Sequence, residues 1–388
     1  MSYAALRSQM DGLGRNIAAP AAAAVDRDAR FPFEAFAALK AGKLLSCYVP
    51  RRRGGLGLSV VEVAELGEIL GHHCGSSAMV FAMHQIQVAC IVHHALGTPY
   101  FEDFLQGLVE HQWLLASATT ETNIGGDVRT SICAVEREGD RFRLEKQAPV
   151  ISYAEEADVI LVTARRERDA GPNEQVHVLV KRGDVTLTPL SSWDTFGFRG
   201  TCSLGYVLRA EGPLSQILPV PYAQIHARTM HAFSHSVWSS LWLGIAEDAV
   251  SRARAFVRSQ ARKSPDKLPP TALRLAELDV ALSSMRALVR QGVGAYQLRL
   301  DQAAEGGAPF AEDMGFTLQI NNLKVRSSEL LVSIVSDALL ICGIAGYRND
   351  SPYSLGRHLR DAWGAPLMVH NDRILGQSSM IQIMRGAS

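Results

Sequence analysis

The chain has 388 residues, of which 47% are hydrophobic and 20% are charged, and this balance is that of a globular protein rather than a disordered one. Its 39 basic and 39 acidic residues cancel, so no overall charge attracts nucleic acid or an anionic membrane surface. A chain of this length has room for two or three domains. We therefore expect no nucleic-acid partner, and any anionic ligand must be bound by a local cluster of charges.

The sequence shows no targeting signal. Residues 1–20 contain no basic segment followed by an apolar run and a cleavage site, and we expect no apolar run of about 20 residues that could span a bilayer. The six cysteines are scattered and form no CxxC pair, which argues against a zinc site or a thioredoxin-like redox site. We expect a cytoplasmic protein with reduced cysteines and no membrane partner.

The first 113 residues have the pattern of a helical domain. Apolar residues recur every three or four positions over residues 4–110, for example in residues 60–70. The glycine-rich segment Pro50–Leu58 interrupts this pattern because it holds too many glycines for a helix interior. We predict an N-terminal helical domain at residues 1–113.

Residues 114–222 show the shorter period of β-strands. Apolar and polar residues alternate at 141–144, residues 157–164 are an almost continuous apolar run, and residues 175–180 and 185–189 follow after polar turns. We predict that this middle domain is a small β-barrel or β-sandwich.

Helical spacing returns after these strands and continues to the end of the chain. Loops around residues 265–270 and 306–309 break it, and a long helix over residues 321–342 ends at Gly343. We predict a C-terminal helical domain at residues 223–388. The order of helices, strands and helices predicts an α+β fold, and strands grouped in the middle argue against the alternating units of a Rossmann domain.

Five segments resemble, in the same order, the motifs of the acyl-CoA dehydrogenase superfamily. They are Pro50–Leu58, Ala118–Asp127, Lys146–Asp158, Phe196–Thr201 and Lys324–Asp361. The second resembles the family's Thr-Glu-Pro-x-Ala-Gly-Ser-Asp signature, the third its Gly-x-Lys-x-x-Ile-Thr-Asn strand, and the last its C-terminal helix pair with a GxxGY turn. The resemblance implies a helical domain, a small β-domain, a C-terminal four-helix bundle and an FAD cofactor.

The resemblance also implies where the flavin ring binds. The pyrimidine edge of the ring needs hydrogen-bond donors, and by resemblance Thr120 and Ser152 supply them while Val150 packs on the ring. Thr122 stands where the family has Pro, and Gly126 stands where it has Ser, so Gly126 offers the cofactor no side chain. The alternative is that these segments are a polar turn and a structural serine.

In the family, FAD is also clamped from a neighbouring subunit by an Arg on one helix and by a Gln and a Gly near the GxxGY turn. Gly343 fits that Gly, Leu340 stands at the Gln position, and Arg258 or Arg262 is expected to contact the pyrophosphate. The alternative for both arginines is a solvated helix surface. The resemblance thus implies a homotetramer or a homodimer.

The carboxylate that acts as the base in the family's dehydrogenases is missing. Its usual position falls on Val369, followed by His370 and Asn371, and its alternative position falls on Ser234, followed by His235. The Val369 N–H can still bind a thioester oxygen, and Ser234 and Asn371 are candidate substrate contacts. The base is then His370, His235 or Asp372, or none is needed.

Three functions remain open at this point. The chain is either an α,β-dehydrogenase with an unusual base or an oxygenase in which reduced flavin reacts with O2, and it acts on an acyl-CoA or on an acyl group held by a carrier protein. The first reading implies an electron-transfer flavoprotein as oxidant and the second implies O2. The third function, from another class, is that of a catalytically silent binding or regulatory protein.

Overall fold

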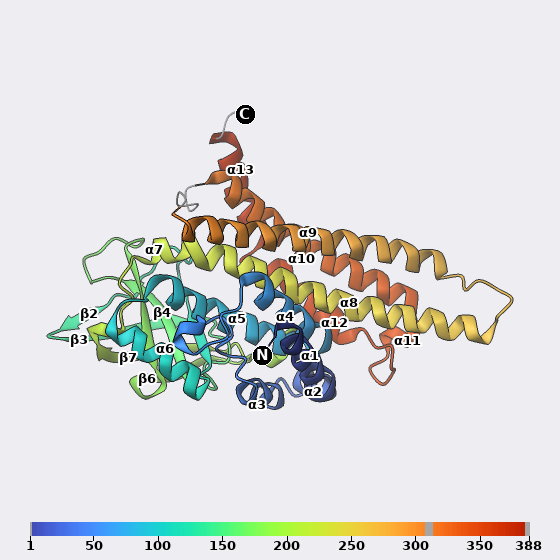
Figure 1. Cartoon of the computed structure of the whole chain (residues 1–388), viewed down its shortest axis with the longest axis horizontal. Helices are drawn as coiled ribbons and strands as arrows, with labels where there is room; N and C mark the ends of the chain where they lie inside the picture. The colour runs from blue at the N-terminus through green and yellow to red at the C-terminus, as the bar shows by residue number, and fades with distance from the viewer. Residues whose placement is uncertain (1, 307–312, 385–388) are drawn as a thin grey trace.

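The computed structural model describes residues 2–306 and 313–384. Figure 1 shows a long helical bundle with the β-domain packed at one end of it and the N-terminal helices packed along its side. The N-terminal helices are α1 Tyr3–Leu13, α2 Ala19–Arg27, α3 Phe33–Ala41, α4 Val60–His73, α5 Gly75–His94 and α6 Pro99–His111. The glycine-rich segment at residues 50–58 forms the turn that leads into α4.

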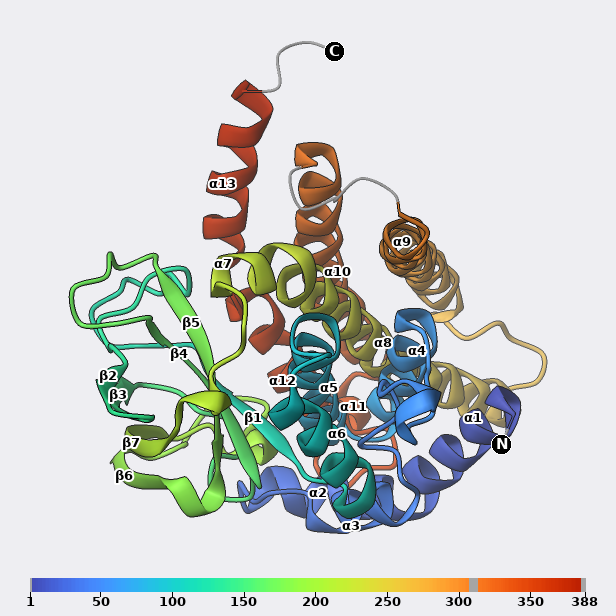
Figure 2. The same cartoon turned by 60° about the vertical axis from the view of Figure 1, so that its left-hand side comes forward.

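Helix α5 differs from the sequence-based expectation. It has 20 residues and a mean hydropathy of 1.3, so by length and composition it is able to cross a membrane, and the expectation that no such run exists was wrong. Within the fold, 94% of this segment is buried. Figure 2 shows the reason, since α5 lies between the β-domain and the C-terminal helices. Its apolar character on every side is that of a core helix.

The middle domain contains two small sheets. Its strands are β1 Leu115–Ala118, β2 Glu136–Glu138, β3 Arg141–Ala148, β4 Val159–Arg165, β5 Gln175–Lys181, β6 Val185–Ser191 and β7 Gly205–Pro213. One sheet has the order β1-β4-β5, with β1 parallel to β4, and the other has the order β2-β3-β7-β6 with antiparallel pairs. The strand expected over residues 146–158 ends at Ala148, because Pro149 begins a run of turns that carries the chain to β4.

The C-terminal domain is built on three long helices. Its elements are α7 Tyr222–Ile225, α8 His231–Lys263, α9 Ala272–Ala304, α10 Met314–Cys342, α11 Ile344–Tyr347, α12 Gly356–Leu367 and α13 Asn371–Met384. Beyond Gly306, the break predicted at residues 306–309 lies outside the described residues. Helices α8, α9, α10 and α12 form the bundle, and α13 stands away from it (Figure 1). The predicted α+β fold of helices, a small β-domain and a helical bundle is confirmed.

Two glycines bring the N-terminal and C-terminal domains together. A Cβ added at Gly71 on α4 would meet the carbonyl oxygen of Leu241 on α8, and a Cβ added at Gly244 would meet that of Glu68. The α4 and α8 backbones therefore approach more closely than any other residue type allows. Glu68 also accepts a bidentate ion pair from Arg290 on α9, at 2.6 and 2.7 Å. Through these contacts the N-terminal helix α4 packs directly on α8 and α9 of the C-terminal domain.

Candidate functional site

The segment after β1 lies against the segment after β3. Thr120 Oγ1 donates a 2.7 Å hydrogen bond to the Val150 carbonyl, and Thr122 Oγ1 donates one of 3.0 Å to the Gln147 carbonyl. The Thr122 N–H donates to the same carbonyl at 2.9 Å. The structure therefore brings Thr120 and Val150 together, as the resemblance implies, and leaves the Val150 side chain 37% exposed.

Ser152 lies on the turns that follow. Its hydroxyl shares a 2.8 Å hydrogen bond with that of Ser203, which in turn bonds the hydroxyl of Thr201 at 2.7 Å. The neighbouring main chain is fixed by bonds from the Ile151 N–H to the Leu204 carbonyl and from the Tyr153 N–H to the Thr201 carbonyl. The residues on both sides of Ser152 are thus held by backbone hydrogen bonds to the segment before β7.

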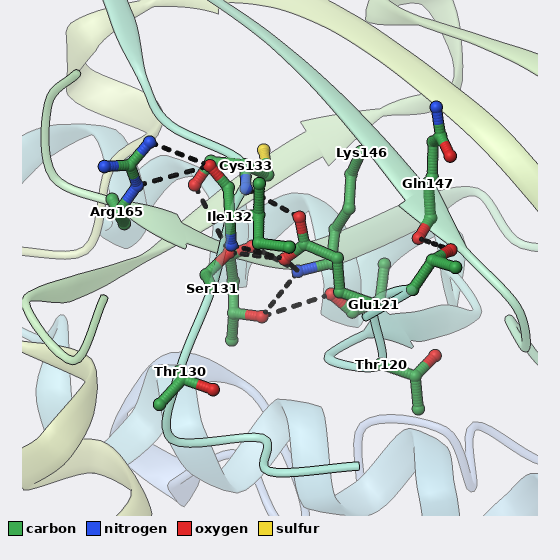
Figure 3. Close-up of polar contacts among 12 residues, drawn as sticks. Thr120, Glu121, Thr130, Ser131, Ile132, Cys133, Lys146, Gln147 and Arg165 are labelled. Carbon is green, nitrogen blue, oxygen red and sulfur yellow. Dashed lines mark hydrogen bonds and ion pairs between the residues drawn. The ribbon is translucent and has the colours of Figure 1, made fainter. Parts of the chain in front are cut away.

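A buried ion pair between Lys146 and Glu121 fixes the backbone next to Thr120 (Figure 3). Lys146 lies on the inward face of β3 and is fully buried, and its Nζ donates at 3.1 Å to Glu121 and at 2.8 Å to the Thr163 carbonyl. The Glu121 carboxylate also accepts from the Ser131 hydroxyl and from the Cys133 N–H, both at 2.6 Å. Every charge in this cluster is therefore paired or hydrogen-bonded, which is the condition for burying an ion pair without a large penalty.

The donors at this edge suit a flavin ring. Among the described residues, the main-chain N–H groups of Thr120 and Ser152 donate to no protein group. The side chains of both residues are nevertheless held by hydrogen bonds. Each residue also carries a hydroxyl, and the Val150 side chain next to them is partly exposed. Two free N–H donors and an apolar side chain are the groups that the polar edge and the face of an isoalloxazine ring require.

The loop that contains Gly126 contacts the C-terminal domain. Gly125 and Gly126 both have positive φ, of 60° and 75°. Arg373, in the first turn of α13, donates a 3.2 Å hydrogen bond to the Gly125 carbonyl and lies 3.5 Å from the Asp127 carboxylate. A Cβ at Gly126 would be 3.1 Å from the Arg373 guanidinium, so the glycine makes room for this contact.

The α12–α13 turn carries Val369 and His370. Both residues are exposed and adopt left-handed conformations, with φ of 54° and 48°. Such a conformation costs about 1–3 kcal/mol for a non-glycine residue and is especially unusual for β-branched valine. Within the described chain the Val369 N–H has no hydrogen-bond partner, and the His370 ring has no polar contact. The turn therefore presents a free main-chain donor and a free imidazole.

Asn371 holds this turn against α10. Its Oδ1 accepts a 2.6 Å hydrogen bond from Lys324 Nζ, and its Nδ2 donates one of 3.1 Å to Ser328 Oγ. Lys324 is fully buried and lies 6.0 Å from the centre of the Trp242 ring on α8. Burial lowers the pKa of Lys324 to about 8.

Ser234 and His235 lie on α8 and are both buried. The Ser234 hydroxyl donates to the His231 carbonyl of its own helix at 3.0 Å. His235 Nδ1 has no hydrogen-bond partner among the described residues. Burial, followed by the nearby His231 and Lys324, lowers the pKa of His235 well below its ordinary value, so the ring is neutral. Lys324, which binds Asn371, thus also contributes to the low pKa of His235.

Arg258 and Gly343 are not near these residues. Arg258 is exposed near the end of α8, and Gly343, with φ of 55°, ends α10. Figure 1 shows that both helix ends lie at the end of the bundle opposite the β-domain. One chain therefore does not bring Arg258 and Gly343 to the ring-binding edge, and a contact between them and a cofactor held there requires a second subunit.

Three residues of the site were missed in the sequence. Lys146 and Glu121 form the buried pair beneath Thr120, and Lys324 contacts Asn371. A signal existed for Lys146, which occupies an inward position of the alternating segment β3 where an apolar residue is expected. No comparable pattern distinguished Lys324, because a single lysine on a long helix is usually on the surface.

Two family models match the chain. Residues 2–109 match the N-terminal domain of acyl-CoA dehydrogenase, and residues 227–368 match its C-terminal domain, so that together they cover well over half of the sequence. The chain belongs to the acyl-CoA dehydrogenase superfamily. Members of this superfamily are flavin-dependent oxidoreductases that bind FAD, and the donors at Thr120 and Ser152 suit that cofactor.

Relatives within the superfamily have different activities. The chain is 24% identical over 367 residues to a short-chain-specific acyl-CoA dehydrogenase of Clostridium acetobutylicum, covering 92% of this chain and 91% of the relative. It is 27% identical over 347 residues to the amino sugar nitrososynthase DnmZ of Streptomyces peucetius, covering 87% and 82%. The FMN-bound TdsC of Paenibacillus sp. A11-2 has a similar structure, with a TM-score of 0.83 at 19% identity and 96% coverage of both chains.

Proposed function

We propose that this superfamily member acts on an acyl thioester, carried by coenzyme A or by an acyl carrier protein, and that it oxygenates this substrate. The observation that carries the proposal is the α12–α13 turn. It retains a free main-chain N–H at Val369 but has a valine where the family's dehydrogenases place their carboxylate base. Ser234, at the alternative position of that base, is bonded to its own helix.

Some residues of the site are proposed to bind the cofactor and others the substrate. Bound flavin would supply the redox chemistry. Oxidised flavin would accept a hydride, whereas flavin reduced by an external two-electron donor would give two electrons to O2, so that one oxygen atom enters the substrate and the other leaves as water. Thr120 and Ser152 orient the ring through their free N–H groups, and Val150 covers its face. The Val369 N–H is placed to polarise the thioester carbonyl, because a fixed main-chain donor stabilises negative charge that develops on oxygen. Ser234 is the proposed substrate contact, because both atoms of the Asn371 amide are bonded to α10.

Dehydrogenation is the second candidate, and the free imidazole of His370 favours it. His370 lies next to the proposed oxygen-binding N–H and has no polar partner in the described chain, so it is available to remove the α-proton of the substrate. His235 is less suited to this role because its low pKa makes it a weak base. In this reading the oxidant of the reduced flavin is an electron-transfer flavoprotein.

We also propose that the protein is a homotetramer, or at least a homodimer, of the cytoplasm. Leu340, Ile344 and Tyr347 are 63–75% exposed around the end of α10, beside the Gly343 turn, and exposed apolar clusters of this kind mark protein interfaces. A second subunit packed there would place Arg258 and Gly343 near the cofactor of its neighbour. All six cysteines are free thiols, as expected for a cytoplasmic protein. Light scattering and cell fractionation test these two proposals.

One experiment separates the three functions. The purified protein is first assayed for bound flavin, and a colourless protein that takes up no flavin supports the silent binding protein. The flavoprotein is then mixed anaerobically with a panel of acyl-CoAs, where bleaching of the flavin band without O2 indicates dehydrogenation. Finally, chemically reduced flavoprotein and substrate are exposed to ¹⁸O₂. Product that carries ¹⁸O supports oxygenation, and bleaching with unlabelled product overturns it.

A further inference from the structure

The strained turn at Val369 and His370 needs an anchor. Two consecutive non-glycine residues in the left-handed region persist only where their surroundings hold them there. The turn itself provides few contacts, because both side chains are exposed. Within the described chain its backbone hydrogen bonds are all local, such as the one from the His370 N–H to the Leu367 carbonyl at 3.1 Å. The anchor must therefore lie in the residues that follow.

Asn371 is the first residue after the turn, and both the oxygen and the nitrogen of its side-chain amide are hydrogen-bonded to residues of α10. Lys324 donates to its Oδ1 at 2.6 Å, and its Nδ2 donates to Ser328 Oγ at 3.1 Å. Lys324 and Ser328 are four residues apart and therefore lie on one face of α10. An amide held at both atoms has little rotational freedom, so the backbone at Asn371 is fixed relative to α10.

Lys324 is an unusual residue for this position. It is fully buried, and within the described chain it forms no ion pair with a carboxylate. Among the described residues its contacts are uncharged: its Nζ lies 6.0 Å from the centre of the Trp242 ring on α8 and donates to the Asn371 amide on α13. A buried lysine without a counter-ion destabilises a fold, and such a residue is retained where it serves a specific function.

We propose that Lys324 is a positioning residue: by holding Asn371, it keeps the Val369–His370 turn in the conformation that presents the Val369 N–H to the substrate. The bond to a charged donor is stronger than one to a neutral group, which suits an anchor that must maintain a strained turn. Arg373 provides an exposed anchor at the Gly125 carbonyl, and a buried hydrogen bond from Asn321 to Ser378 joins α10 to α13 further along the helix. Lys324 differs from both because it holds the residue directly after the turn. The kinetic part of this inference rests on the proposed function, whereas its structural part does not.

The test compares Lys324→Met, Asn371→Leu and the double variant with the matched control Arg326→Met. Arg326 lies on the same helix two residues away, with an exposed side chain paired to Glu329 at 3.2 Å. We expect amide hydrogen exchange over residues 367–373 to rise at least tenfold in Lys324→Met and in Asn371→Leu, measured both with and without flavin, and to stay unchanged in the control. The thermal midpoint of Lys324→Met should not fall, because replacing a buried unpaired charge with an apolar side chain is neutral or stabilising.

The kinetic readout uses the same variants with a substrate found by the acyl-CoA panel. We expect kcat to fall roughly 10- to 100-fold with a smaller change in KM, and the double variant to lose no more than either single variant. Unchanged exchange in Lys324→Met overturns the inference, as does a much larger loss of kcat in Lys324→Met than in Asn371→Leu, which would mean that the lysine acts on bound ligand directly. Faster exchange without turnover of any acyl thioester leaves the inference standing and counts against the proposed function.

Discussion

The main-chain N–H of Phe198 donates a 2.6 Å hydrogen bond to Asp361 Oδ1 on α12, 163 residues further along the chain. Phe198 itself has a left-handed backbone with φ of 48°, and a Cβ at the preceding Gly197 would meet the Arg360 carbonyl. This bond fastens the turn at the end of the β-domain to the bundle. Asp361 is 1% exposed, and burial raises the pKa of its carboxyl to about 6.

Asp361→Asn should therefore make stability less dependent on pH. The pKa of Asp361 is higher in the folded than in the unfolded chain, so its contribution is fully present below about pH 4 and is lost as pH rises through about 6, by roughly 3 kcal/mol. Asparagine keeps an oxygen for the Phe198 N–H but does not ionise. Thermal midpoints at pH 5 and pH 8 should differ less in Asp361→Asn than in wild type, and an equal difference would contradict this account.

Lys146→Met should destabilise the β-domain by about 3–5 kcal/mol, because it leaves the Glu121 carboxylate buried without its cation. The double variant Lys146→Met with Glu121→Gln should recover part of this loss. The matched control is Arg209→Ala, which breaks an exposed pair with Glu145 on the same strand β3 and should cost about 1 kcal/mol or less. Urea unfolding monitors all three, and a loss in Lys146→Met no larger than that in the control would exclude the buried pair as a main source of stability.

Thr120→Val should weaken flavin binding about tenfold, because it removes the bond to the Val150 carbonyl and the hydroxyl at the ring-binding edge. Thr122→Val removes an equivalent bond to the Gln147 carbonyl two residues away and serves as the control. Flavin fluorescence gives both affinities. If the two variants bind flavin equally well, the Thr120 hydroxyl does not contribute to flavin binding.

For the dehydrogenation candidate, His370→Ala should lower turnover roughly tenfold or more while flavin stays bound. The reason is that the imidazole directly follows Val369 and has no polar partner in the described chain. Asp372→Asn tests the neighbouring carboxylate, which is exposed in the first turn of α13 and should be nearly neutral. Turnover is measured under saturating substrate, and flavin content is read from the absorption band. Wild-type turnover in His370→Ala removes this residue from the mechanism.

Arg258→Gln should weaken binding of FAD about tenfold but leave binding of FMN unchanged, because only FAD has the pyrophosphate that a second subunit would contact there. Arg254→Gln, on the same helix and paired with Asp279 at 2.7 Å, is the control. Titrations with both flavins separate the outcomes. An equal loss for FAD and FMN would indicate a general effect on the bundle instead.

The sequence alone determined the fold class and indicated the segments that we propose to bind the ring, because both depend on local patterns. Helical spacing, strand alternation and turn residues identified the three regions, and the ordered motifs placed Thr120, Val150 and Ser152 near one another. The strands β1, β2 and β7 were not predicted. β1 and β2 have four and three residues at the edges of their sheets, which is too short to show a period. The nine residues of β7 were not recognised as a strand, although β7 lies in the middle of its sheet. For α5, composition alone did not separate a core helix from a membrane span.

The tertiary structure decided which charges are buried and what they contact. Lys146 and Lys324 become significant only because folding removes each from water and places acceptors within hydrogen-bond distance. These acceptors are Glu121 and Thr163 for Lys146, and Asn371 for Lys324. The left-handed backbone at Val369 and His370 likewise became visible only in the tertiary structure. Long-range contacts of this kind are set by how helices and sheets dock, and no local pattern of residues encodes them.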